Sequence, residues 1–242
     1  MKNVLFHLFI LTVEKRTMRI SEIEMPDTID GKPTRNNLGQ LIHPTVEGIK
    51  NFWRWFGDSK VVDSKGRPLV MYHGTYPTKM QSGKMLGDFD AFNRKASTEI
   101  VKRIPSYDQV GLWFSSKPGN PGAEGYGNFI YPVYLRAIDY KRTTFDAMVK
   151  TMYRLAAGES SGKDFSPAMA KDVEPYREFL RDNGYDSVLI FHDSSRENYS
   201  TEFKDQTVWI VLEPEQVKSA VGNNGNFSPN SQKITEKSVK IT

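Results

Sequence analysis

Hydrophobic and polar positions follow two different periods along this chain, and these periods predict its helices and strands. After Thr45, a good helix N-cap, apolar residues recur at spacings of three and four up to Gly57, which predicts one amphipathic helix. The same spacing predicts helices at residues 145–157 and 171–183. Short apolar runs rich in β-branched and aromatic residues predict strands at 68–73, 111–115, 130–138, 185–191 and 208–212.

These elements do not alternate regularly, so an α+β fold is favoured over a doubly wound sheet. Neither a Gly-x-Gly-x-x-Gly turn nor a P-loop motif is present, which leaves Rossmann-type and P-loop nucleotide binding without support. The absence of cysteine excludes disulfides, thiolate catalysis and cysteine-ligated zinc. The four histidines lack the paired spacing of metal ligands, so we expect no catalytic metal.

Polar stretches at both ends predict the limits of the folded domain. The chain divides into a partly irregular N-terminal extension, a folded domain and a polar, disordered tail, at residues 1–44, 45–221 and 222–242. An apolar run at 4–11 is too short to span a bilayer and has no small-residue cleavage site after it. We therefore expect a cytoplasmic protein without stable membrane association. Met1 and Met18 are alternative starts.

The charge of the chain gives only a mild preference for anionic partners. The net charge is +4, but lysine and arginine are spread along the sequence without a run. NAD-like or phosphate-bearing ligands fit this distribution as well as a nucleic acid does.

Three strands that are far apart in the sequence end in polar or aromatic residues, which predicts one cleft for a flat, polar heterocycle. The first ends at His73-Gly74-Thr75. A single histidine there is more often structural, but the glycine lets a ligand approach the main chain, whose N–H and C=O can pair with an amide. The second strand carries Trp113, with the short hydroxyl of Ser115 beside it.

A further aromatic residue, Tyr126, follows a segment rich in glycine and proline. A ring in such a segment is able to lie flat against a bound heterocycle, although core packing is the alternative for this residue and for Trp113. The third strand, 208–212, continues into a Glu-Pro-Glu-Gln-Val block.

In this order, the blocks resemble the ADP-ribosyltransferase superfamily, on the side related to poly(ADP-ribose) polymerases and diphtheria toxin. The family's His-Gly-Thr/Ser turn, Gly-x-Tyr-Phe-Ala strand, Ser-Ala-x-Tyr segment and Glu-Tyr-x-Val-Tyr-x-x-x-Gln-Val element are similar to residues 73–75, 111–115, 123–126 and 208–217. The resemblance is closest to the domains of phage and mobile-element polyvalent proteins, whose further blocks recur at 55–63 and 214–220.

The resemblance implies a split antiparallel β core with flanking helices, and NAD as the substrate without a metal. By position, His73 would bind the 2′-hydroxyl of the adenosine-side ribose. Gly74 would pair its main chain with the nicotinamide carboxamide, and Thr75 would stand near the same ligand. Tyr126 would stack on the nicotinamide ring, with Trp113 in the central aromatic position.

The chain departs from the family pattern at its charged residue. The glutamate that opens the last strand and stabilises positive charge at the nicotinamide ribose falls on Val208, although a slip in strand register would change this assignment. His73 is one catalytic candidate. The others are three polar residues near this position, and each of them has a solvated loop position as the competing interpretation: Gln206, Glu202 and Glu197. Ser115 would only line the pocket.

The resemblance therefore predicts an NAD-dependent mono-ADP-ribosyltransferase of the toxin or effector type, which modifies a host protein or nucleic acid. A single transfer is expected because relatives without the glutamate transfer one ADP-ribose or are inactive. Three alternatives stay open. They are a catalytically silent NAD- or partner-binding module, an NAD glycohydrolase, and an RNA-directed 2′-phosphotransferase, which would need a cluster of arginines that the sequence does not suggest.

Overall fold

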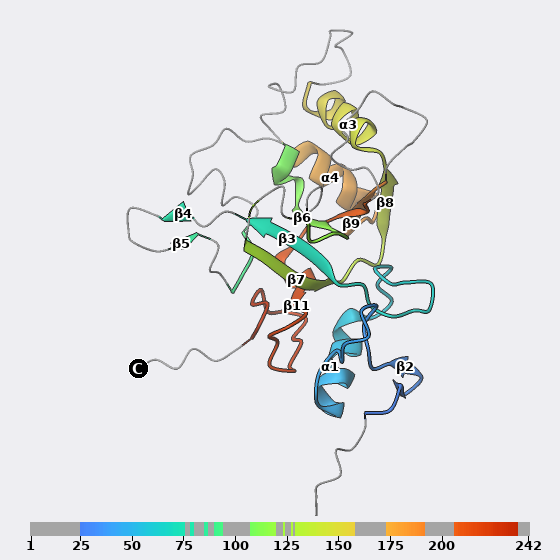
Figure 1. The fold of residues 1–242 in the computed structure, drawn as a ribbon. Helices are drawn as coiled ribbons and strands as arrows, with labels where there is room; N and C mark the ends of the chain where they lie inside the picture. Colours follow the sequence, from blue (N-terminus) through green and yellow to red (C-terminus); the bar gives the residue numbers. More distant parts are fainter. Residues whose placement is uncertain are drawn as a thin grey trace, which may run out of the picture.

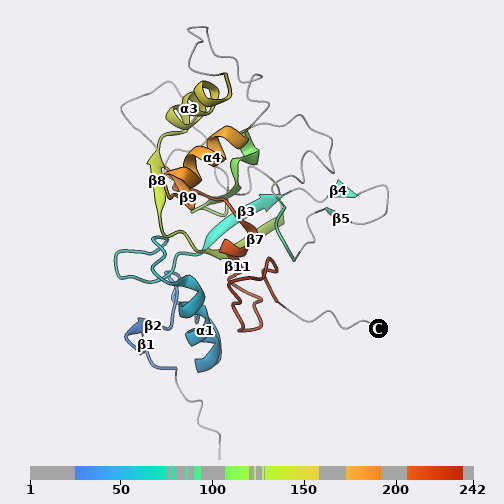
Figure 2. The ribbon, with the colours of Figure 1, turned by 180° about the vertical axis from the view of Figure 1, so that it is seen from behind.

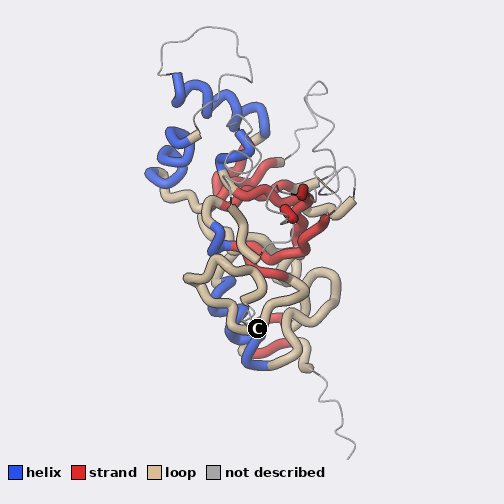
Figure 3. The backbone as a smooth tube through the Cα atoms, turned by 90° about the vertical axis from the view of Figure 1, so that its left-hand side faces the viewer, coloured by secondary structure: helices blue, strands red, loops and turns tan. Residues whose placement is uncertain are grey.

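The structure, a computed structural model, describes residues 25–75, 78–79, 85–86, 90–93, 107–119, 123, 127, 129–157, 173–191 and 206–236. A seven-stranded sheet forms its centre (Figure 1). Helices α3 (Phe145–Ala157) and α4 (Glu174–Asp182) lie above the sheet in this view, near β8 and β9, and α1 (Val46–Phe56) lies below β3 and β7. The views from behind and from the side agree on this arrangement (Figures 2 and 3).

The large sheet is mixed but mostly antiparallel. In chain order its strands are β3 Met71–Thr75, β6 Leu112–Ser115, β7 Phe129–Leu135, β8 Tyr140–Thr143, β9 Ser187–Ile190, β10 Val208–Val211 and β11 Val217–Ser219. In space their order is β11-β7-β3-β6-β10-β9-β8, and only β8 and β9 are parallel. The fold is α+β, as the sequence predicts.

Smaller elements surround this sheet. Two short hairpin-like sheets are formed by β1 Thr28–Ile29 with β2 Lys32–Pro33, and by β4 Thr78–Lys79 with β5 Met85–Leu86. Two 3-10 turns precede β6 and β11, namely η1 Tyr107–Val110 and η5 Pro214–Gln216.

The predicted strands and helices are all found within a few residues of their expected limits, but two strands of the large sheet, β8 and β11, were not predicted, and neither were the strands of the two small sheets. The strand β8 has the sequence Tyr-Lys-Arg-Thr, without an apolar run. It pairs in parallel with β9, and such a pair needs a long crossover, which α3 and α4 provide here. Local periodicity carries no signal for a partner so far along the chain.

Helix α1 begins and ends where the sequence predicts. The Thr45 hydroxyl accepts a hydrogen bond from the Gly48 N–H (3.1 Å), and Gly57 closes the helix at a positive φ of 57°. The face of the helix that points into the protein is aromatic, and its residues Phe52, Trp55 and Phe56 are buried. These side chains fix the helix on the sheet.

Three buried clusters divide the core between the elements. The helix-side cluster joins α3 and α4 to one face of β6, β9 and β10, and includes Met148, Leu180, Val188, Val208 and Ile210. The inner cluster joins β3, β6, β7 and β10, and includes Met71, Phe92, Phe114, Val133, Trp209 and Ile234. The α1 cluster includes Phe52, Trp55, Phe56, Val70, Tyr134 and Phe227. The two halves of the sheet therefore share one inner core and have separate outer cores.

The prediction of a disordered tail is wrong for residues 222–236. The side chains of Phe227 and Ile234 are only 1% and 2% exposed, and they belong to the α1 and inner clusters. The polar residues around them bind the main chain, as in the bond from the Asn51 amide to the Gly225 carbonyl (3.0 Å). A polar composition suggested disorder because it does not reveal that two apolar side chains are sufficient to anchor the segment.

We expect Phe227→Ala to destabilise the protein by about 3–5 kcal/mol, because it removes a buried ring between Phe52 and Trp55. The free energy of unfolding in urea measures this loss. As a control, Val221→Ala, at the residue directly before this segment, should change it by less than about 0.5 kcal/mol, since that side chain is 72% exposed. Equal values for the two variants would mean that residues 222–236 do not pack on α1.

Candidate functional site

The large sheet opens between β3 and β6. Strand β3 pairs with β7 over all five of its residues, but with β6 only at Tyr72 and Ser115. From this pair onward the two strands separate. The candidate site lies at this split.

The alternation of main-chain hydrogen bonds along β7 shows which main-chain groups of β3 face the split. The Pro132 carbonyl accepts from the Ala220 N–H (3.0 Å), so Pro132 faces away from β3. Because main-chain groups alternate along a strand, Tyr131 faces β3 and pairs with His73. Gly74, the next residue of β3, therefore presents its N–H and C=O toward β6.

The His73 side chain occupies the rung at which the two strands would otherwise pair. Continuing the register from Tyr72 and Ser115, Gly74 would lie opposite Trp113. The Trp113 carbonyl instead bonds His73 Nδ1 (2.9 Å). A carbonyl only accepts, so Nδ1 carries the hydrogen, and Nε2 of the neutral ring is an acceptor. The imidazole thus keeps the main chain of Gly74 from pairing with β6.

Two aromatic rings fix the orientation of this imidazole. Phe92 lies edge-on to it, with ring centroids 5.0 Å apart and an interplanar angle of 85°, and Phe114 lies 5.6 Å away. Burial lowers the pKa of His73, although the hydrogen bond to the Trp113 carbonyl opposes this shift. The ring is therefore neutral at pH 7.

Gly74 also lies against the chain segment that follows β6. A Cβ atom at this position would overlap the Ala123 carbonyl group and would lie 3.2 Å from the Gly127 carbonyl oxygen. Ala123 is itself held by a hydrogen bond from its N–H to the Lys117 carbonyl (3.0 Å). The sequence suggested that glycine is needed here for a ligand to approach, and the structure adds the close passage of the protein's own chain.

Trp113 lies close to His73 along the main chain, but its side chain points to the other face of the sheet. Its indole N–H donates to the Asp108 carbonyl (3.0 Å), and its ring contacts Tyr107 and Phe145 beside the helix-side cluster. His73, by contrast, contacts rings of the inner cluster. The sequence alone predicts both residues in one cleft and does not indicate this difference of face.

Ser115, Gln206 and Val208 share the face of Trp113. The Ser115 hydroxyl donates to the Gln206 amide oxygen and accepts from the Lys117 N–H (2.9 Å). Val208 pairs with Ser115 in the register of β6 and β10, and its side chain is buried in the helix-side cluster. In this register, the Ser115 hydroxyl lies directly opposite the expected carboxylate position, and the Gln206 amide is bonded to that hydroxyl.

The other predicted site residues are placed only in part. Thr75 ends β3, one residue beyond Gly74. Tyr126, Glu197 and Glu202 lie outside the described residues. Within the described ranges, no group of three or more His, Asp or Glu side chains could hold a metal ion. No helix among the described elements is long and apolar enough to cross a membrane.

A hollow of about 510 Å³ lies elsewhere, at the far end of β10 from Gln206. Its lining includes Arg136, Arg181, Tyr185, Asp186, Glu213 and Glu215. The mixture of charges leaves no single ligand chemistry favoured there, and the hollow does not include residues of the split. We therefore place the candidate site by the split of the sheet rather than by this hollow.

The split sheet, flanked by helices on its outer faces, has the fold of ADP-ribosyltransferases. A family model described as "ADP-Ribosyltransferase in polyvalent proteins" matches residues 63–227, and the chain belongs to this family. Membership confirms the resemblance found in the sequence and implies that the protein uses NAD. Comparisons with curated proteins and with solved structures gave no match.

The lowered pKa of His73 predicts how stability depends on pH. The unfolded chain takes up the proton near pH 6.5 and the folded protein only at lower pH. Below about pH 6.5 the unfolded state therefore binds more protons than the folded state. The contribution of His73 to the free energy of unfolding consequently declines as the pH falls. Above about pH 7.5 it is constant, because both states are then neutral.

This contribution is measured as the difference in unfolding free energy between the wild type and His73→Gln. We expect the difference to be constant above pH 7.5, and to shift in favour of the variant as the pH falls below about 6.5. The control, Thr75→Ala in the same strand, has no titrating group at the changed position, so its offset should not vary with pH. A constant offset for His73→Gln would show that the imidazole has an ordinary pKa.

Proposed function

We propose that this protein binds NAD at the split between β3 and β6 and transfers a single ADP-ribose to a macromolecule in the cytoplasm of a host cell. The observation that carries the proposal is the pair of main-chain groups of Gly74, which face the split without a rung to Trp113. The family, whose description refers to polyvalent proteins, supports the transferase class.

The main chain of Gly74 is complementary to the nicotinamide carboxamide. A carboxamide has one acceptor oxygen and an NH₂ donor, and a strand residue offers one N–H and one C=O side by side. The match requires no side chain. It also explains why a flat amide would bind here in the manner of an added strand residue.

His73 would hold a ribose hydroxyl. With Nδ1 committed to the Trp113 carbonyl, the neutral ring has Nε2 as an acceptor for a hydroxyl hydrogen. Protonation would turn this acceptor into a donor, and the lowered pKa of His73 keeps the ring neutral at physiological pH. Thr75 would lie near the same ligand.

The aromatic and small residues of the second block would complete the pocket. We infer that Tyr126 stacks on the nicotinamide ring, as the family resemblance implies. Trp113, whose ring is partly buried beside Tyr107, would contribute apolar surface from the face of Ser115. The Ser115 hydroxyl would line the pocket and orient the Gln206 amide.

In the reaction, the bond between nicotinamide and ribose C1′ breaks, its electron pair leaves with nicotinamide, and the acceptor attacks C1′ and loses a proton. The protein's main contribution is to position the groups and to stabilise the positive charge that develops at C1′. Val208 offers no charge, so we assign this role to the Gln206 amide oxygen, with Glu202 and Glu197 as alternatives. A neutral dipole stabilises less than a carboxylate does, which fits one transfer rather than chain elongation.

Labelled NAD, incubated with the purified protein and a bacterial lysate, tests the proposal. We expect label on a macromolecule, and a loss of about 100-fold in His73→Ala because the ribose is no longer positioned. The control is Tyr72→Phe, in the same strand, whose side chain packs toward the α1 cluster and not toward the inner cluster.

The other outcomes identify the alternatives. Consumption of NAD without label on a macromolecule would indicate an NAD glycohydrolase. Tight binding of NAD without its consumption would indicate a silent binding module, which the apolar Val208 favours. Absence of NAD binding would contradict the proposal.

We further expect Gln206→Glu to release nicotinamide about tenfold faster or more, because a carboxylate of the same size adds negative charge where positive charge develops. The Ser115 hydroxyl can donate to the new carboxylate as it does to the amide. Gln40→Glu, an exposed amide on the N-terminal arm, is the control for added charge alone. Unchanged rates in both variants would remove Gln206 from the mechanism and leave Glu202 and Glu197 as candidates.

A further inference from the structure

We propose that residues 231–236, here called the C-terminal strap, position His73 through the contacts of this segment with Asp90 and through Phe92, and thereby support the binding of NAD. The expected effect of the strap on NAD binding rests on the proposed function. The positioning of His73 by the strap follows from the contacts described below.

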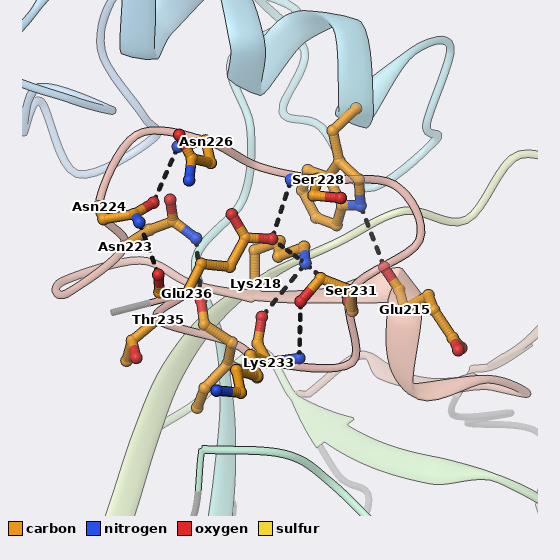
Figure 4. Close-up of polar contacts among 12 residues, drawn as sticks. Glu215, Lys218, Asn223, Asn224, Asn226, Ser228, Ser231, Lys233, Thr235 and Glu236 are labelled. Carbon is orange, nitrogen blue, oxygen red and sulfur yellow. Dashed lines mark hydrogen bonds and ion pairs between the residues drawn. The ribbon is translucent and has the colours of Figure 1, made fainter. Parts of the chain in front are cut away.

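The strap is fastened to the sheet by a buried lysine. The Lys218 side chain on β11 has no exposed surface, and its Nζ donates to the Ser231 carbonyl (2.8 Å), the Lys233 carbonyl (3.2 Å) and Glu236 Oε1 (2.5 Å) (Figure 4). An ammonium has three hydrogens, and each has a partner here. The strap therefore has one defined conformation at β11.

The strap in turn binds the segment 90–93. The Ile234 N–H donates to the Asp90 carbonyl (2.8 Å), and the Thr235 N–H and hydroxyl both donate to Asp90 Oδ1 (2.9 and 2.5 Å). Ala91 and Lys233 form an antiparallel bridge. Both the carboxylate and the carbonyl of Asp90 are thus bonded to the strap.

The same short segment carries Phe92, the ring that lies edge-on to His73. Phe92 is 5% exposed and also contacts Phe114, with centroids 5.4 Å apart. Ile234 of the strap belongs to the same inner cluster as Phe92. A path of direct contacts therefore leads from Lys218 through the strap to the imidazole.

The position of Phe92 determines two properties of His73. The edge-on ring limits rotation of the imidazole about the bond that Nδ1 makes to Trp113, and so it directs Nε2. It also covers part of the imidazole, and burial is what lowers the pKa of His73. Loosening of residues 90–93 should therefore alter both the direction of Nε2 and the pKa of His73. Residues 228–236 follow the part of the chain that matches the family, so the strap adds to what defines the family.

The test compares Asp90→Ala with Gln232→Ala. The Gln232 amide also bonds the strap to the rest of the protein, through Glu215 Oε1 (2.9 Å), but this contact does not lead to residues 90–93. The pKa of His73, measured from its imidazole resonances by NMR, and the Kd for NAD are determined for each protein. If Asp90→Ala does not fold, Thr235→Val removes one donor to the same carboxylate, and Thr235→Ser keeps it.

We expect Asp90→Ala and Thr235→Val to raise the pKa of His73 toward its ordinary value and to weaken NAD binding about tenfold. Gln232→Ala and Thr235→Ser should change neither quantity. An unchanged His73 pKa in Asp90→Ala and Thr235→Val would overturn the proposal. The NMR measurement needs no NAD, so a protein that binds no NAD but shows the pKa shift would contradict the proposed function and leave the strap intact.

Discussion

The structure depends on one interrupted ladder, the rung between β3 and β6 at which His73 Nδ1 takes the Trp113 carbonyl from the Gly74 N–H. Main-chain groups that find no partner destabilise a fold by about 1–3 kcal/mol each when they are buried, so an open rung persists only where the surroundings maintain it. The three cores maintain it here, because each half of the sheet has its own outer cluster and the two halves share only the inner cluster. The opening is therefore a property of the whole fold.

The sequence was sufficient for the elements and for the order of the blocks. Apolar periodicity is a local property, and α1, with its cap at Thr45 and its end at Gly57, is determined within a dozen residues. The strand β8 and the packed segment 222–236 depend on partners far along the chain, β9 in one case and Lys218 in the other. Periodicity and composition contain no information about such partners.

The candidate site was predictable as a set of residues but not as a geometry. Alternation along a strand already separates the faces of Trp113 and Phe114, yet only the pairing of Tyr72 with Ser115 shows that His73 lies with Phe114. Phe92 is recognisable in the sequence as an aromatic residue that anchors a loop, but it belongs to no block of the family resemblance. Nothing in the sequence therefore indicates its contact with His73. Its role follows from the strap, a contact across more than half of the chain.

The missing charge at Val208 follows from the packing of β10. Val208 and Ile210 point into the helix-side cluster, where an ionised carboxylate would be strongly destabilising unless it were paired. Gln206 lies two residues before Val208 on the same face and is not part of the helix-side cluster. Its amide oxygen accepts a hydrogen bond from the Ser115 hydroxyl. A buried polar group can therefore be satisfied by the Ser115 hydroxyl at Gln206, just before β10, without entering the helix-side cluster. Under the proposed function, a dipole at Gln206 takes the place of the charge that the family resemblance expects, so the positioning of NAD by Gly74 and His73 would carry more of the chemistry.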